Sequence, residues 1–228
     1  RYTRLERKMR AAYDAYDFQS LAHAVNEFVT VELSALYLDV SKDRLYTFRA
    51  DSVERRSAQT ALYLLANGLV RLLAPILSMT ADEIWSRLPG TREPSVHMAD
   101  FPSSPESWID DALDSHWEAL ADVRHTVNET LERSRAEKVI GAPLTAHITL
   151  TAGGDVFRML QAAETELPML CIVSQVSLRH SGDGPLTVEV AHASGDKCPR
   201  CWRFVPVLSG SGETAVCPRC ADALGHPA

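Results

Sequence analysis

The spacing of apolar residues divides the chain into a long helical region followed by a shorter mixed region. Over about residues 21–40, apolar side chains recur every three or four positions, which predicts a long helix with one apolar side. The stretch at about 51–74 is apolar nearly all round, which predicts the buried central helix of a bundle. A further apolar stripe, from about residue 109 to about residue 135, predicts the last long helix. Several helices with short connections are typical of an antiparallel helical bundle.

Two local signals indicate where helices begin. Thr80 and Glu83 have the spacing of a capping box, in which both side chains satisfy free amides at a helix start. Pro105 suits the first turn of the last long helix, because that turn does not need the N–H that proline lacks. We therefore expect helices to begin at these two points.

Near residue 141 the helical spacing gives way to the alternation that is typical of strands. Residues 146–150 and 186–191 predict two strands, and the apolar run at 169–178 predicts strand material between them. A helix is expected at 155–165. These elements describe a small α/β module.

The whole pattern predicts a mainly α protein in three parts: a helical bundle at 1–138, a small α/β connector at 139–194 and a cysteine-rich segment at 195–228. The chain has 228 residues and begins at Arg1 inside a helical pattern, so we expect it to be part of a longer protein. Its longest apolar run, 61–77, includes Arg71 and Pro75, so we expect a buried helix there and no membrane span.

The net charge of −7 argues against a nucleic-acid partner until its distribution is considered. Residues 82–132 hold 3 basic and 12 acidic side chains, whereas residues 133–228 hold 9 of each. The acidity is thus concentrated in the middle of the chain, where a solvated face is expected. The remainder is nearly neutral with local basic clusters, which permits nucleic-acid binding but does not require it.

Four of the five cysteines form the pattern C-x2-C-x15-C-x2-C, namely Cys198, Cys201, Cys217 and Cys220. This spacing is typical of a four-thiolate zinc site, because each Cys-x-x-Cys turn lets two sulfurs face one ion. A disulfide framework would suit a secreted chain, and a redox motif would need only one pair. We therefore predict one structural Zn²⁺ in a C-terminal zinc knuckle. The fifth cysteine, Cys171, lies in an apolar run and is expected to be an inert core thiol.

A site with four cysteine ligands has no open position for water or substrate, so this metal is expected to stabilise the tail without taking part in catalysis. Trp202 follows one ligand directly and lies among basic residues. Such an aromatic side chain can stack on an unpaired base. It can equally pack the knuckle against the α/β module, and the residues by themselves leave both interpretations open.

Three stretches of the sequence then indicate a family. "YLDVSKDRLY", "LLAPILSMTADEIWSRLPG" and "KCPRCWRF…CPRC" occur in this order, and the chain as a whole resembles the carboxyl-terminal third of bacterial isoleucyl-tRNA synthetases. The second stretch is shared by related synthetases, whereas the first and third narrow the resemblance to the isoleucine enzymes. The resemblance implies a helical anticodon-binding bundle, a small connector and a terminal zinc knuckle that reaches the anticodon arm of tRNA(Ile).

The same resemblance implies where the chemistry takes place. Enzymes of this family join isoleucine to tRNA through an aminoacyl-adenylate, using ATP and Mg²⁺, in the cytoplasm. Their signatures His-x-Gly-His and Lys-Met-Ser-Lys-Ser do not occur in this sequence, and neither does the editing domain. We therefore expect no catalytic residue here. The expected partners are tRNA(Ile) and the catalytic and editing domains of the same polypeptide, in a monomeric enzyme.

Basic side chains and one aromatic side chain are the candidates for RNA contact. They are Lys42, Arg44, Arg133, Arg135, Lys138, Lys197, Arg200, Trp202 and Arg203. The group at 133–138 ends a long helix, where positive charge suits both the helix terminus and phosphates. Arg200 and Arg219 each stand between two cysteines, so either could instead donate to a cysteine sulfur or a carboxylate.

Two other classes of protein compete with this interpretation. A DNA-repair glycosylase of the bacterial type ends in a similar four-cysteine finger, but the long helical region with "YLDVSKDRLY" argues against it. A stand-alone zinc ribbon that binds another protein is compatible with the tail and is disfavoured by the resemblance.

Overall fold

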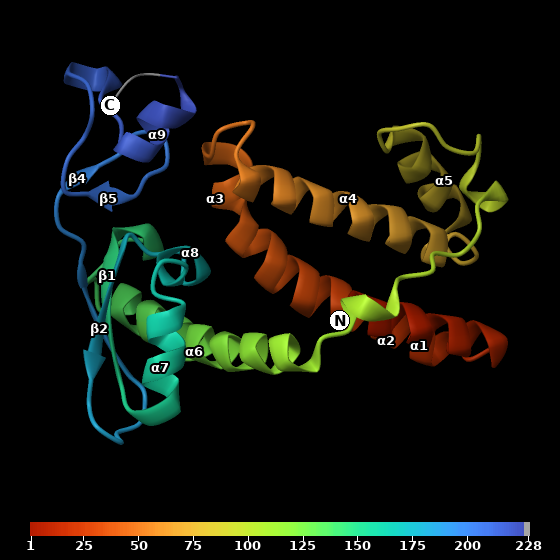
Figure 1. Cartoon of the computed structure of the whole chain (residues 1–228), viewed down its shortest axis with the longest axis horizontal. Coiled ribbons are helices and arrows are strands. Elements are labelled where there is room, and N and C mark those ends of the chain that lie inside the picture. Colours follow the sequence, from red (N-terminus) through yellow and green to blue (C-terminus); the bar gives the residue numbers. More distant parts are fainter. Residues whose placement is uncertain (226–228) are drawn as a thin grey trace. The chain divides into compact units, whose positions relative to one another are not determined.

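The computed structural model describes residues 1–225 and is mainly helical with a small sheet, as the sequence predicts (Figure 1). Residues 226–228, which the predicted knuckle includes, lie outside the described residues. The chain forms two compact units: unit 1 comprises Arg1–Ser41 and Asp51–Asp114, and unit 2 comprises Lys42–Ala50 and Ser115–Ala228. The bundle arrangement and the three-part division at 138 and 194 remain predictions.

Unit 1 is built from helices. They are α1 (Tyr2–Asp14), α2 (Phe18–Glu27), a π-helix (Phe28–Leu38), the first turn of α3 (Asp39–Thr47), α4 (Val53–Leu73), α5 (Ser78–Arg87) and two short 3-10 turns (Val96–Met98 and Glu106–Trp108). The helix expected at 51–74 is thus present as α4, but it is not buried all round, since its buried residues are Ala58, Gly68, Leu69, Val70 and Leu72. The long helix expected at 21–40 lies within an unbroken helical stretch from Phe18 to Thr47, in which α2, the π-helix and α3 follow one another. Within the π-helix only Phe28 is buried, because its wider turns do not keep residues three and four apart on one face.

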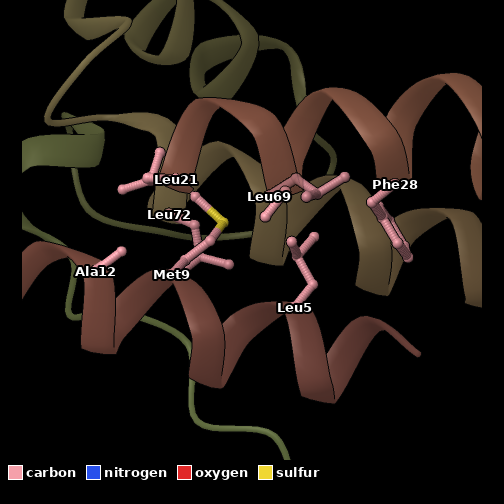
Figure 2. Packing of buried hydrophobic residues seen from close by; sticks show 8 residues of the cluster. Leu5, Met9, Ala12, Leu21, Phe28, Leu69 and Leu72 are labelled. Carbon is pink, nitrogen blue, oxygen red and sulfur yellow. The ribbon is translucent and has the colours of Figure 1, made fainter. Parts of the chain in front are cut away.

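The main core of unit 1 lies between α1, α2 and α4 (Figure 2). Leu5, Met9 and Ala12 follow one another at helical spacing along α1, and α4 contributes Leu69 and Leu72. The helix α2 contributes Leu21 and Ala24, and Phe28, the residue that follows α2, completes the cluster. Complete burial of one such side chain stabilises the fold by about 1.5–3 kcal/mol. This apolar stripe therefore fixes how the three helices pack.

A second, smaller core of unit 1 forms around Trp85 on α5, which packs with Val70 and Val96. The indole Nε1 of Trp85 donates to the main-chain oxygen of Glu93 at 2.9 Å. Next to it, Asp82 Oδ1 accepts hydrogen bonds from Ser95 Oγ at 2.7 Å and from the Val96 amide at 3.0 Å. The loop after α5 is thus held by side chains of α5 itself.

Two predicted helix starts are wrong. The helix α5 begins at Ser78, after an N-cap at Leu77 that makes no side-chain cap bond, so Thr80 lies inside the first turn. The reason is that the preceding turn already places the Leu77 amide on the oxygen of Leu73. Pro105 opens only the short 3-10 turn. The long helix α6 (Asp111–Ala136) begins later, where the Leu113 amide donates to Asp110 Oδ1 at 2.8 Å.

Unit 2 contains a three-stranded sheet in the order β2-β1-β3. The strands are β1 (Ala146–Ala152), β2 (Gln175–His180) and β3 (Thr187–His192), and β1 pairs parallel with β2 and antiparallel with β3. Alternate residues of β1 are completely buried, as its alternating pattern predicts. The helix α7 (Gly154–Ala162) connects β1 towards β2, which is the connection that parallel neighbours require.

The apolar run at 169–178 is not one strand. Its first part belongs to the short helix α8 (Leu167–Leu170), which has Pro168 in its first turn, and β2 begins only at Gln175. Cys171 caps α8 and is 2% exposed. Burial raises the pKa of the Cys171 thiol to about 12, so this thiol is neutral and unreactive.

Within residues 1–225, no helix has both the length and the apolar content needed to cross a membrane.

Candidate metal centre

The tail of unit 2 folds as a two-stranded ribbon followed by a short helix. The strands β4 (Asp196–Lys197) and β5 (Phe204–Val205) pair antiparallel, and α9 (Pro218–Ala223) completes the segment. Ser209 and Val216 form a further antiparallel bridge around the Gly-Ser-Gly turn, as expected for a hairpin. We call residues 196–223 the knuckle.

The four cysteines of the knuckle converge at one point. Their sulfur atoms lie within 4.8 Å of one another, and all four residues are buried. The Cys201 and Cys217 sulfurs are 3.7 Å apart, which excludes a disulfide bond between them. Four sulfurs around a tetrahedral Zn²⁺ at about 2.3 Å would be separated by roughly 3.8 Å. The donor set and its spacing therefore fit a metal ion of the zinc type.

Main-chain hydrogen bonds hold this arrangement. The Trp202 amide donates to the Cys198 oxygen at 2.9 Å, and the Cys198 amide donates to the Arg203 oxygen at 2.9 Å. The Cys217 amide donates to the Cys198 sulfur at 3.3 Å. Burial opposes ionisation of Cys198, but amide donors around its sulfur lower its pKa to about 7. Its thiolate, which is the form that binds metal, is thus favoured near neutral pH.

Arg200 connects the metal centre to α3. Its Nη1 atom donates to the main-chain oxygen of Thr47 at 2.5 Å and lies 3.3 Å from the Cys220 sulfur. Thr47 is the last residue of α3, where unpaired carbonyl oxygens attract cations. Arg200 therefore satisfies a free helix end and a cysteine sulfur at once.

Asp43, also on α3, receives two arginines from the knuckle. Arg219 binds it through two parallel hydrogen bonds, Nη1 to Oδ2 at 2.6 Å and Nη2 to Oδ1 at 2.9 Å. Arg203 Nη2 lies 3.3 Å from Asp43 Oδ2, and the hydroxyl of Thr47 donates to Oδ1 at 2.6 Å. The guanidinium of Arg219 also lies 4.7 Å from the ring centre of Phe48.

Burial and charge act in opposite directions on this cluster. Burial favours the protonated form of Asp43, but the hydrogen bonds from Arg219 and Thr47 and the charge of Arg203 outweigh it and lower the pKa of the carboxyl. Burial lowers the pKa of Arg203, against the opposing effect of Asp43. In Arg219, the carboxylate outweighs burial and raises the pKa. All three groups are therefore charged at neutral pH.

In contrast to the shielded cluster around Asp43, Trp202 is 61% exposed. Its φ of 66° lies in the left-handed region, where a bulky side chain is strained. Lys197 Nζ lies 5.8 Å from the centre of its ring. The contacts between the knuckle and the α/β module come instead from its neighbours: Phe204 donates its amide to Ser174 Oγ at 2.8 Å, and Arg203 reaches the Pro168 oxygen at 3.4 Å.

The other basic candidates lie on helices of unit 2 or, in the case of Lys138, in the turn directly after one. Arg133, Arg135 and Lys138 are exposed around the end of α6, and Arg135 lies 3.5 Å from Glu132. On α3, Lys42 is exposed and Arg44 is half-buried. Of the predicted RNA-binding residues, the structure thus brings Lys197, Arg200, Trp202 and Arg203 together on the knuckle.

Sequence reasoning missed Asp43 and Thr47 as partners of the knuckle. Their partner Arg219 is 176 and 172 residues away along the chain, so no local pattern connects them. The available signal was the repetition of Cys-Pro-Arg-Cys, which places one arginine at the third position of each turn. One arginine bonding a sulfur and the other a carboxylate is the alternative that the sequence left open.

This mainly helical chain with a sulfur cluster matches a known class. A family model described as the anticodon-binding domain of tRNA ligase matches residues 1–150, about two thirds of the chain. The chain therefore belongs to the family of anticodon-binding domains of tRNA ligases.

Its curated relatives are isoleucine–tRNA ligases. The chain is 44% identical over 230 residues to the isoleucine–tRNA ligase of Geobacter sulfurreducens, which covers 96% of this chain and 25% of that protein. It is 43% identical over 227 residues to that of Syntrophotalea carbinolica (95% and 24%) and 40% identical over 228 residues to that of Natranaerobius thermophilus (93% and 24%). The predicted resemblance to isoleucyl-tRNA synthetases is thus confirmed. The chain spans about a quarter of the length of these relatives.

Proposed function

We propose that this chain is the tRNA-recognition segment of an isoleucine–tRNA ligase and binds the anticodon arm of tRNA(Ile). The family match over residues 1–150 and the identity to isoleucine–tRNA ligases over almost the whole chain support this proposal. Activation of isoleucine with ATP and Mg²⁺ belongs to parts of the enzyme outside these residues. The enzyme is proposed to act as a cytoplasmic monomer in which 1–138, 139–194 and 195–228 form bundle, connector and knuckle.

Cys198, Cys201, Cys217 and Cys220 are proposed to hold one structural Zn²⁺. Their sulfurs converge within 4.8 Å, and four thiolates leave no open position on a tetrahedral ion. The metal supplies folding energy, because the knuckle has few apolar side chains beyond the cysteines themselves. The chemistry of this site is therefore binding and shape, with no reaction at the metal.

The observation that best supports a role in RNA binding is that Trp202 is exposed although its backbone conformation is strained. A residue that only stabilised the knuckle would bury its ring or relieve the strain, and Trp202 does neither. An exposed ring beside Lys197 can stack on an unpaired base while the ammonium group meets a phosphate. Lys42, Arg44, Arg133, Arg135 and Lys138 are proposed as further phosphate contacts, and Arg200 and Arg203 as residues near the RNA that mainly hold the knuckle.

Binding of the zinc-loaded chain to tRNA(Ile), to a tRNA with a different anticodon loop and to duplex DNA tests this function. We expect preference for tRNA(Ile) and an affinity that falls as salt rises, because phosphate contacts release counterions. Equal affinity for tRNA(Ile) and duplex DNA would contradict it and favour the glycosylase class.

A matched pair of variants tests the role of Trp202. Trp202→Ala should lower the affinity for tRNA(Ile) about fivefold to a hundredfold, as expected from about 1–3 kcal/mol for one stacked base. Trp108→Ala removes another exposed tryptophan, 47% exposed on a 3-10 turn of unit 1, and should leave the affinity unchanged. Equal losses in both variants would sink the assignment of Trp202.

A further inference from the structure

We propose that Asp43 is a positioning residue that anchors the knuckle on α3 and thereby fixes the orientation of Trp202. The anchoring itself depends only on contacts within unit 2. The consequence for RNA binding rests on the proposed function.

The carboxylate of Asp43 is the point where the knuckle arginines meet. Arg219 uses both outer nitrogens on both carboxylate oxygens, and Arg203 adds a third contact at 3.3 Å. The side chain of Asp43 is 18% exposed, and those of Arg203 and Arg219 are 16% and 31% exposed. Paired charges in such a shielded place are screened little by solvent, and loss of one partner leaves the others uncompensated.

Further contacts of the knuckle arginines show which segments the anchor joins. Arg203 also reaches the Pro168 oxygen of α8, so Asp43, the knuckle and the α/β module meet through one guanidinium. Arg200, from the first Cys-Pro-Arg-Cys turn, holds the end of α3 at Thr47, and Arg219, from the second turn, holds Asp43. Both turns thus use their arginines for the same short segment, Lys42–Ala50.

This arrangement separates two roles within the knuckle. The arginines inside the Cys-Pro-Arg-Cys turns bind α3, whereas Lys197 and Trp202, just outside the first turn, remain exposed. Two basic side chains that the sequence assigns to RNA therefore have a partner within the protein: Arg200 donates to the Thr47 carbonyl oxygen, and Arg203 pairs with the Asp43 carboxylate. Without Asp43, the cysteines can still hold their metal, but the exposed pair loses its fixed orientation.

The test is Asp43→Asn, which keeps the size of the side chain and removes its charge. We expect one zinc per chain as in the wild type, at least tenfold faster hydrogen exchange of amides in 44–50 and in the knuckle, and a threefold to thirtyfold weaker affinity for tRNA(Ile). The matched control is Asp222→Asn. Asp222 pairs with Arg49 of the same segment at 3.3 Å, but both side chains are about half exposed, so this pair should contribute little.

Hydrogen exchange tests the anchoring of the knuckle, and the affinity for tRNA(Ile) tests the role of the anchor in orienting Trp202. Wild-type exchange rates in Asp43→Asn would overturn the anchor, whatever the affinity. Faster exchange with unchanged affinity would overturn its role in orienting Trp202. If the wild-type chain does not bind tRNA(Ile), the proposed function fails while the exchange data still decide the anchor.

A second variant guards against a general loss of structure in Asp43→Asn. Arg219→Lys keeps the positive charge but cannot form the two parallel hydrogen bonds. We expect it to accelerate exchange in the same amides, and the double variant to be no worse than Asp43→Asn alone, since both changes remove one interaction. Additive effects of the two changes would overturn the proposal.

Discussion

Gly153 lies so close to Gly182 that a β-carbon on Gly153 would stand 1.9 Å from the Gly182 carbonyl oxygen. The Gly154 amide donates to that same oxygen at 3.0 Å, so the turn after β1 and the turn after β2 hold each other. We expect Gly153→Ala to destabilise unit 2 by about 1–3 kcal/mol, because backbone, and not a flexible side chain, would have to move.

Urea unfolding followed by circular dichroism measures this effect. Gly141→Ala is the control, since a β-carbon at Gly141 meets nothing within 4 Å, and its effect should stay within about 0.5 kcal/mol. Equal stability of the two variants would show that the turns are not in contact in solution.

The core of unit 1 should be sensitive to loss of volume at α4. Leu72 is fully buried against Met9 and Leu21, so Leu72→Ala should lower the free energy of unfolding by about 2–5 kcal/mol. Leu64 on the same helix is 41% exposed, and Leu64→Ala should have a much smaller effect. Denaturant midpoints of the two variants compare them directly, and similar midpoints would contradict the packing in Figure 2.

Removal of the metal should unfold the knuckle and leave the helices largely in place. We expect one zinc per chain by elemental analysis, and a strong chelator should make four further thiols reactive to a thiol reagent. Cys217→Ser should abolish zinc binding, whereas Cys171→Ala should retain it, because Cys171 is buried away from the cluster of four. Zinc-independent protection of all four thiols would refute a metal-dependent fold.

The left-handed backbone of Trp202 predicts an unusual difference between two substitutions. Trp202→Gly should hold its zinc against a chelator at least as firmly as the wild type, and about 1 kcal/mol more firmly than Trp202→Ala, because only glycine adopts this conformation without strain. Both variants should bind tRNA(Ile) weakly. A loss of zinc in Trp202→Gly would instead assign the indole a structural role.

Asp82 should contribute to the acid stability of unit 1. Hydrogen bonds from Ser95 and then from the Val96 amide lower its pKa in the folded state. The stabilisation is therefore fully present above the unfolded value of about 3.9 and is lost as pH falls through the lower folded value. Asp82→Asn should be less stable at neutral pH and lose less stability on acidification.

Thermal unfolding between about pH 2 and pH 7 tests this sign. Glu83→Gln, an exposed acidic residue on the same helix, serves as control and should follow the wild-type profile. An Asp82→Asn profile parallel to that of the wild type would contradict the assignment.

Periodicity and spacing were enough to predict part of this structure. The helix α4 and the alternating burial of β1 follow local patterns that the sequence shows, and the cysteine spacing identified the converging sulfurs. The errors arose where neighbouring elements decided the outcome. Thr80 does not cap α5, because the preceding turn lets the helix begin earlier, at Ser78. The apolar run around Cys171 is not one strand, because its first residues belong to α8, which has Pro168 in its first turn.

The functional residues show the same division between local and long-range information. Cys198 and Cys201 are close in sequence, so their joint role is visible there. The partner of Arg219 is not, because Asp43 stands in a basic stretch far earlier in the chain that is typical of a solvated turn. The sequence left open a sulfur or a carboxylate as the partner of Arg219 and assigned Arg203 to RNA, and only the folded chain shows that both arginines pair with Asp43.

The dependence of α3 on the knuckle also has a consequence for biosynthesis. Asp43 precedes Arg219 by 176 residues, so at about 5–20 residues per second a ribosome adds the second partner roughly 10–35 s after the first. Until Arg200 and Arg203 have been added, α3 has no arginine of the knuckle to bind. The segment Lys42–Ala50 therefore completes its folding only after nearly the whole chain has been made, and we expect nascent chains that stop before Arg200 to be cleaved there by proteases.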